Sequence, residues 1–247
     1  MIGGFYMANP MLNERAFERA KIEAARPAQS MTLQGTINKT FLLLFICVIG
    51  GMISWANPQT WAPFSWVILI GAFILALITS FKPAFSPVLS PIYAVLEGLF
   101  LGGVSAAYNA ELNGIVFNAV AATVLVFFIM LAVYKSGLIK MSRGLMMTIF
   151  CATGAICVLY LGSWILSLFG VSTAYLTSSS PLSIGISVVV CLVAAFNFLI
   201  DFYFIDQMTG QYTAPKYMEW YGAFGLLVTL IWLYIEILSL LGKVQRR

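Results

Sequence analysis

Long apolar runs and short polar connections alternate along most of the chain. From residue 40 onward seven apolar runs follow one another, each close to the roughly 20 residues that a helix needs to cross a bilayer. The connections carry turn-forming residues, as in "ANPQTWAP" and "TSSSPLS". The pattern therefore predicts an all-α, polytopic membrane protein, a seven-transmembrane-helix bundle. We expect the spans at Thr40–Trp55, Phe64–Ser80, Val88–Tyr108, Gly114–Tyr134, Gly144–Phe169, Ser183–Ile205 and Trp220–Leu241.

Two polar segments flank the predicted transmembrane domain of residues 40–242. Residues 1–39 are the only extended polar part and are expected to form a cytosolic tail, and residues 243–247 a short basic C-terminal tail. Within the first tail, Asn13–Pro27 combines helix formers with mixed charges and ends at a proline. We expect a solvated or surface-lying helix there, with a specific docking element as the alternative.

Composition supports a membrane protein and narrows its chemistry. Of the 247 residues 61% are hydrophobic and only 9% are charged, whereas soluble domains carry about 25% charged residues. Histidine is absent, which argues against imidazole zinc sites, histidine-ligated haem and Ser-His dyads. The four cysteines fall inside apolar runs, where thiols behave as small hydrophobes. We expect no cofactor and no enzymatic activity, because a paired nucleophile and base are missing.

The distribution of lysine and arginine predicts the orientation. With the N-terminus inside, the inner side holds ten of them, and the outer side only Lys243, Arg246 and Arg247. The positive-inside rule then favours a cytoplasmic N-terminus, and we expect a bacterial inner membrane. A re-entrant last segment, returning the basic C-terminus to the cytosol, is the alternative. The net charge of +4 sits in short clusters beside apolar spans, so no nucleic-acid partner is expected. The ten inner residues are Arg15, Arg19, Lys21, Arg26, Lys39, Lys82, Lys135, Lys140, Arg143 and Lys216.

Three carboxylates, Glu97, Asp201 and Glu236, lie within the predicted spans, which contain no lysine, arginine or histidine. A membrane carboxylate normally pairs with a base or faces a wet cavity. We therefore expect the counter-charge to be a proton, an ion from solution or a side chain reaching in from the rim. The three acids would lie at different depths, as in a ladder that a cation path would use. The alternative is that they stay protonated and hydrogen-bonded between helices, and either state would make them sensitive to pH.

The residues around these acids suggest how each is oriented. Asn197 lies one turn before Asp201 on the same face, whereas Asp206 lies on another face and is expected to be a solvated charge at the rim. Glu236 shares a face with Thr229. Glu97 lies beside a ridge of small residues, for which we expect close helix packing that turns Glu97 into the bundle. The ridge consists of Ala94, Gly98, Gly102 and Ala106.

Three longer motifs carry a family resemblance. They are "LEGLFLGG" (Leu96–Gly103), "FNFLIDFYFIDQ" (Phe196–Gln207) and "EWYGAFGLLVTLIWLYIEILSLLG" (Glu219–Gly242). With the seven-span plan they make the chain resemble the transmembrane Bax inhibitor motif family, the Bax inhibitor / YccA group, in its bacterial branch with an N-terminal extension. The resemblance covers roughly residues 40–242. It implies a seven-helix bundle with the last helix in the middle.

The resemblance also implies a function, a pH-sensitive calcium leak. In this family two aspartates, one on each of the last two crossing helices, close the pore through a shared proton or hydrogen bond. Asp201 matches the first, but the second falls near Val228 or Thr229, where no carboxylate stands. Thr229 could hydrogen-bond Asp201 instead, and Glu219 is another candidate partner. Glu236 lies too far along the helix, about 18 Å away by the helical rise.

Two hypotheses about function follow. The first is a pH-sensitive leak channel or transporter for a cation, calcium or protons, in which the path or gate is formed by carboxylates and their neighbours. The second is a non-transporting regulator that binds another membrane protein. The resemblance implies this alternative, because YccA-type relatives resemble modulators of a membrane quality-control protease. Apart from the bilayer, the expected partners are therefore an ion or a membrane protein. The candidate residues for the path or gate are Asp201, Glu97, Glu236, Thr229, Glu219 and Asn197.

Overall fold

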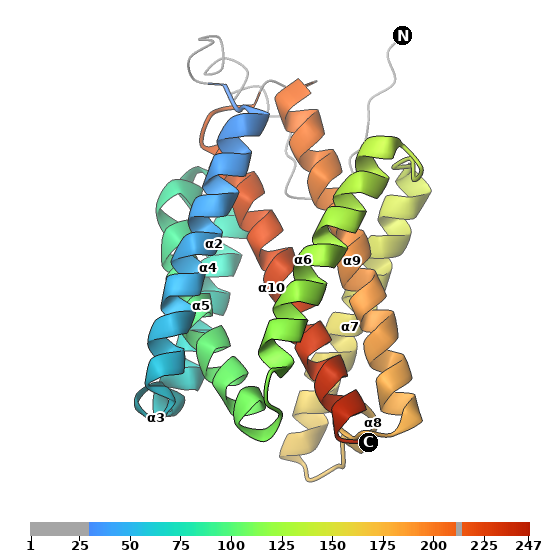
Figure 1. The fold of residues 1–247 in the computed structure, drawn as a ribbon. Helices are drawn as coiled ribbons and strands as arrows, with labels where there is room; N and C mark the ends of the chain where they lie inside the picture. Colours follow the sequence, from blue (N-terminus) through green and yellow to red (C-terminus); the bar gives the residue numbers. More distant parts are fainter. Residues whose placement is uncertain (1–29, 211–213) are drawn as a thin grey trace.

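The computed structural model describes residues 30–210 and 214–247 of the chain. The described part is built of helices that run side by side in alternating directions (Figure 1). The tail helix expected at Asn13–Pro27 lies outside the described residues. The long helices are α2 (Leu33–Ala56), α4 (Ser65–Phe81), α5 (Ser86–Glu111), α6 (Ile115–Ser136), α7 (Arg143–Leu168), α9 (Pro181–Gly210) and α10 (Met218–Gln245). Short helices in the connections are α3 (Pro58–Trp61), η2 (Ala62–Phe64), η3 (Pro83–Phe85) and α8 (Ala174–Thr177).

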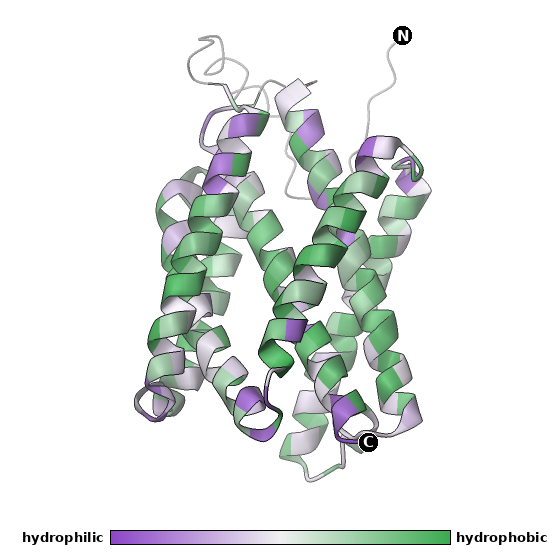
Figure 2. Cartoon of the chain, in the orientation of Figure 1, coloured by the Kyte–Doolittle hydropathy of each residue, from purple (hydrophilic) through white to green (hydrophobic). Residues whose placement is uncertain are grey.

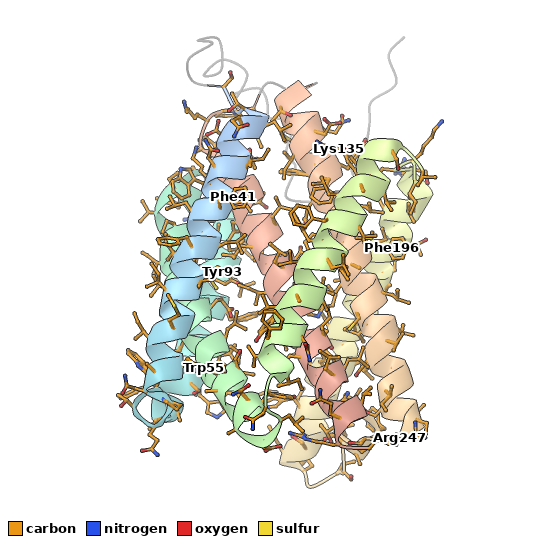
Figure 3. The ribbon with its side chains drawn as sticks, in the orientation of Figure 1. Phe41, Trp55, Tyr93, Lys135, Phe196 and Arg247 are labelled. Atoms are coloured by element: carbon orange, nitrogen blue, oxygen red, sulfur yellow. The ribbon has the colours of Figure 1, made fainter. Side chains whose placement is uncertain are left out.

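Seven helices of the described part are long and apolar enough to cross a membrane, which confirms the predicted all-α fold class. Hydrophobic residues cover the middle of the bundle, and hydrophilic residues gather towards its two ends (Figure 2). Apolar side chains also point outwards, as Phe41 of α2 does with 66% of its surface exposed (Figure 3). A bundle whose apolar side chains face outwards is suited to a lipid environment rather than to water.

The last helix, α10, lies in the middle of the bundle. It packs against α2, α5, α6 and α9. Of its apolar window 56% is buried, compared with at most 39% for any other described span. The sequence explains this position, because α10 carries alanine, glycine and leucine on several faces rather than along one stripe, so that neighbours can pack all round it. The arrangement expected from the family resemblance is therefore present.

Two helix boundaries differ from the prediction, and each difference places a lysine inside a helix. α2 begins at Leu33 rather than Thr40, because Thr32 caps it by accepting a hydrogen bond from the Gly35 amide at 3.0 Å. α10 continues to Gln245 instead of ending at Leu241. The polar tail and the basic tail are thus both shorter than predicted. Lys39 and Lys243 belong to helices.

The two ends of the described chain lie at opposite ends of the bundle. α2 begins at one end, near Lys135, while Arg247 lies at the other (Figures 1 and 3). α10 crosses the bundle as one uninterrupted helix of 28 residues. The re-entrant last segment considered above is therefore not what the chain forms. The cytoplasmic placement of the N-terminus stays a prediction.

α2 and α5 pack with their backbones in close contact. A Cβ atom added at Gly98 would collide with the carbonyl group of Cys47, and one added at Gly102 would collide with that of Gly51. The small-residue ridge of α5 therefore does what its spacing predicts: it lets two helices approach closely. This packing also turns Glu97 inwards, where only 8% of its surface is exposed.

Candidate functional site

A cavity of about 400 Å³ lies between α4, α9 and α10, towards the end of the bundle where α2 begins. α4 and η3 form one wall, α9 forms the other, and the first turns of α10 lie between them. Most lining side chains are apolar or aromatic. The polar side chains in the lining are Ser80, Asp201, Tyr221 and Thr229. Among the described residues, Asp201 is thus the only carboxylate that lines this cavity, and no lysine or arginine does.

Asp201 of α9 faces Thr229 of α10. The Thr229 hydroxyl donates a hydrogen bond to Oδ2 of Asp201 at 2.6 Å. Helical rise alone predicts levels about 7 Å apart for the two residues, but both side chains are short, so the hydrogen bond shows that α9 and α10 bring them close to one level. The other carboxylate oxygen, Oδ1, faces Gly225, where an added Cβ atom would lie 3.7 Å away. Within the described part, no hydrogen-bond donor is recorded for Oδ1.

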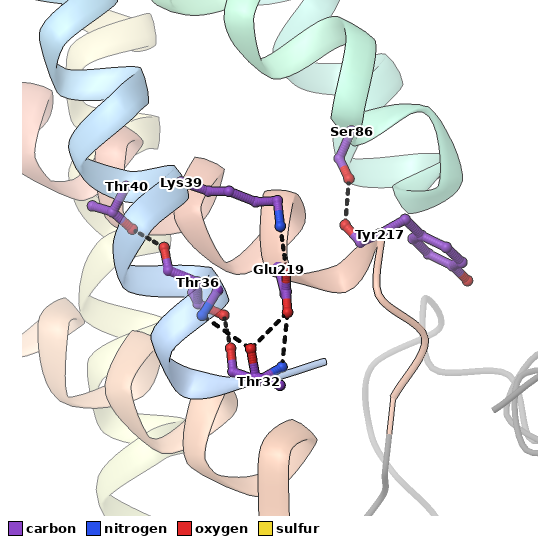
Figure 4. A network of polar contacts seen from close by, with 8 residues as sticks. Thr32, Thr36, Lys39, Thr40, Ser86, Tyr217 and Glu219 are labelled. Atoms are coloured by element: carbon purple, nitrogen blue, oxygen red, sulfur yellow. Dashed lines mark hydrogen bonds and ion pairs between the residues drawn. The ribbon is translucent and has the colours of Figure 1, made fainter. Parts of the chain in front are cut away.

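Glu219, the other candidate partner of Asp201, is bound elsewhere. Its side chain is almost completely buried, with 1% of its surface exposed. It accepts hydrogen bonds from the backbone amide and hydroxyl of Thr32, at 3.0 and 2.8 Å, and forms an ion pair with Lys39 (Figure 4). The proposal that Glu219 pairs with Asp201 is therefore wrong, because the start of α2 satisfies its carboxylate.

This network fastens three helices together at one end of the bundle. Next to the Thr32 contacts, the Met31 amide donates to the carbonyl of Ala214 at 2.7 Å. The Ser86 hydroxyl at the start of α5 donates to the carbonyl of Tyr217 at 3.1 Å (Figure 4). The starts of α2, α5 and α10 are held by these bonds. The sequence carries a partial signal: threonine recurs every fourth residue at Thr32, Thr36 and Thr40, which indicates the face of α2 that is turned towards the bundle.

Glu236 lies in a second polar cluster, among α7, α9 and α10. The Tyr160 hydroxyl is 2.9 Å from each of its carboxylate oxygens, and the Trp232 indole donates to Oε1 at 3.2 Å. Lys243, two turns further along α10, is buried and donates to the Ser187 hydroxyl at 2.6 Å. Lys243 and Glu236 also interact electrostatically. For Glu236 the structure therefore agrees with one of the three expected counter-charges, a side chain reaching in from the rim, because α10 extends far enough to carry Lys243.

The remaining candidates point to other neighbours. Glu97 interacts with Tyr93, one turn earlier on α5. Asn197 donates to the Thr153 hydroxyl of α7 at 2.9 Å, so it does not share a polar stripe with Asp201. The sequence could not exclude this, because residues four apart on a helix still differ by about 40° in direction. Asp206 is exposed at the rim, as predicted.

A family model described as Bax inhibitor 1 like matches residues 9–246. The chain belongs to this family. No curated protein matches it. The match covers nearly the whole chain, so it includes both the Asp201 cavity and the cluster around Lys243.

The site of this Bax inhibitor 1-like protein differs from the expected ladder of acids. Of the three carboxylates within predicted spans, only Asp201 lines the cavity, while Glu97 and Glu236 are satisfied by other partners. Among the described residues, no three acidic or cysteine side chains gather as a metal cluster. What the structure brings together is one carboxylate, one hydroxyl and an apolar cavity.

Proposed function

We propose that this Bax inhibitor 1-like membrane protein is a pH-sensitive cation leak, with Ca²⁺ as the ion and Asp201 as the group that responds to pH. One observation carries the proposal: the Asp201 carboxylate lines a cavity of about 400 Å³, with a hydroxyl on one oxygen and no donor from the described residues on the other. Calcium prefers carboxylate, hydroxyl, carbonyl and water oxygens. Asp201 supplies the charge, and water would supply most of the remaining ligands.

The carboxylate of Asp201 gives this leak its expected pH dependence, whereas its contact with Thr229 does not depend on pH. A hydroxyl can donate to a carboxylate or accept from a carboxylic acid, so the contact between α9 and α10 persists in both protonation states of Asp201. What changes with pH is the charge in the cavity. A proton and a metal cation compete for the same carboxylate, so cation flux should rise as Asp201 loses its proton, that is, with rising pH.

Ion flux in reconstituted vesicles tests the proposal. Asp201→Asn should lower Ca²⁺ flux by about tenfold or more, because one unscreened charge in a low-dielectric cleft concentrates cations to this extent, and should remove most of the pH dependence. Asp206→Asn is the matched control, since it removes the same charge from the exposed rim of the same helix. Equal flux in Asp201→Asn and the unmodified protein, at every pH tested, would rule the proposal out.

A non-transporting regulator is the second candidate function. It is favoured by the separation of the three acids, which do not share one cavity. It is also favoured by the Glu219 network, because this network gives the start of α2 a defined place on the bundle. Deleting residues 1–29 leaves Thr32 and Lys39 in place. Loss of a co-purifying membrane protein in this deletion, together with no flux in vesicles, would favour the regulator.

A further inference from the structure

We propose that the Asp201 cavity binds a small organic amine, an ammonium group attached to an apolar body. This goes beyond the proposed leak, because such binding would be present whether or not ions pass through the protein. The inference depends on three features of the cavity: its charge, its walls and its size.

The negative charge of Asp201 forms no ion pair with a lysine or arginine in the described part of the chain. Among the described residues, Asp201 is the only side chain of the lining expected to be ionised at neutral pH, and none of them donates a hydrogen bond to its Oδ1. The nearest lysine along the chain from the lining residue Pro83 is Lys82. Its ammonium group lies over the ring of Phe85, 5.9 Å from the ring centre. An incoming ammonium group would provide both the charge and the missing hydrogen-bond donor.

The walls favour an organic cation over a bare metal ion. Phe204 of α9 and Tyr221 and Phe224 of α10 line the cavity, together with several aliphatic side chains. Aromatic faces attract ammonium groups, and apolar walls stabilise an apolar body that leaves water. A hydrated Ca²⁺ ion gains nothing from these walls. A ligand with one charged end and one apolar end uses both parts of the cavity.

The size of the cavity fits a small molecule, since ligand pockets typically measure about 300–1,000 Å³. Gly225 helps to create the space beside the carboxylate. A Cβ atom added there would meet only Oδ1 of Asp201, at 3.7 Å. A larger side chain at Gly225 would therefore enter the cavity without removing the charge. This gives a steric test that is separate from the electrostatic one.

Binding of 2-phenylethylamine to the purified full-length protein tests the inference, with 2-phenylethanol as a neutral ligand of nearly the same shape. We expect the amine to bind at least tenfold more tightly than the alcohol. Asp201→Asn should reduce the affinity for the amine to that for the alcohol, whereas Asp206→Asn should leave both unchanged. Gly225→Leu should weaken both ligands, and thermal unfolding shows whether this variant is folded.

Two outcomes would overturn the inference: no amine binding by the unmodified protein, or amine affinity that is unchanged by Asp201→Asn. The comparison of the two aspartate variants decides this even if Gly225→Leu does not fold.

A second experiment identifies the source of the amine. Competition by ethanolamine phospholipids, measured in nanodiscs against discs of choline phospholipids alone, would indicate a lipid head group. Unchanged binding of the amine in both discs would indicate a soluble amine. Vesicle flux is a separate measurement, so the leak and the amine site can fail independently.

Discussion

At the scale of single residues, Thr229 stands about where the family resemblance implies the second aspartate. Where the resemblance implies a second aspartate, the structure places a hydroxyl 2.6 Å from Asp201. Two carboxylates at that distance cannot both ionise without strong repulsion, so an aspartate pair would need to keep a shared proton. A threonine has no such requirement. The contact between α9 and α10 is therefore expected to be stable over a wider range of pH than in a two-acid pair.

Replacing Thr229 tests this directly. In Thr229→Asp the two carboxylates share a proton at low pH and repel each other once both are ionised. Its thermal midpoint should therefore fall relative to that of Thr229→Asn as the pH is raised from 5 to 8. Thr229→Asn is the matched control, because its amide has similar size and stays neutral. A difference between the two midpoints that does not depend on pH would contradict the argument.

At the scale of the helices, ionisable residues near their ends hold the bundle together. Lys39 of α2 and Glu219 of α10 form an ion pair whose two members differ in exposure, at 18% and 1% of their side-chain surfaces. Removing Glu219 leaves a lysine that can still reach water. Removing Lys39 leaves a buried carboxylate that keeps only the two hydrogen bonds from Thr32. The two substitutions should therefore not be equivalent.

We expect Lys39→Gln to destabilise the protein by about 3 kcal/mol, the scale of breaking a buried ion pair from one side, and Glu219→Gln to destabilise it by less. The double variant should be more stable than Lys39→Gln alone, because no unpaired buried charge remains. Denaturant unfolding in mild detergent measures all three free energies. If Glu219→Gln proves the more damaging single change, the exposure argument is wrong.

The same pair shows what could and could not be predicted from the sequence. The seven spans follow from the length of the apolar runs, and the close contact of α2 with α5 follows from the spacing of Gly98 and Gly102. The true start of α2 could not be predicted in this way. Thr32 caps this helix locally, but its polar first turns are held in the bundle by Glu219, which pairs with Lys39, 180 positions away. Partners so far apart are invisible to local pattern.

At the scale of the whole molecule, the site was only partly predictable for a related reason. Counting along the last span placed Thr229 near Asp201, and the hydrogen bond is present. The sequence could not show that Glu97 and Glu236 have other partners, or that Asn197 points to α7. Helix periodicity predicts the direction of a side chain only to within a sector around the helix axis. The helix that the side chain contacts in this sector depends on how all the helices pack.

One face of α10 nevertheless links the two polar regions of the bundle. Gly225, Thr229, Glu236 and Lys243 are spaced by four, seven and seven residues, which returns them to nearly the same direction on the helix. This face begins at the Asp201 cavity and ends at the buried ammonium group of Lys243, which is bound to Ser187. On the proposed function, a cation that follows this face from the cavity passes Glu236 and then meets the ammonium group of Lys243 before it leaves the bundle.

Lys243 should therefore limit the leak. Removing its charge in Lys243→Gln should raise cation flux by on the order of tenfold, the reverse of the effect of removing the Asp201 charge, whereas Lys243→Arg should keep the flux low. The cation flux of the double variant Asp201→Asn/Lys243→Gln should be close to that of Asp201→Asn alone, because a cation passes the cavity and the lysine one after the other on the same route. Flux in the same vesicles, normalised to folded protein, measures all four. If Lys243→Gln and Lys243→Arg conduct equally, the charge at this end of α10 does not control the route, and cations would have to leave the cavity without passing along this helix face.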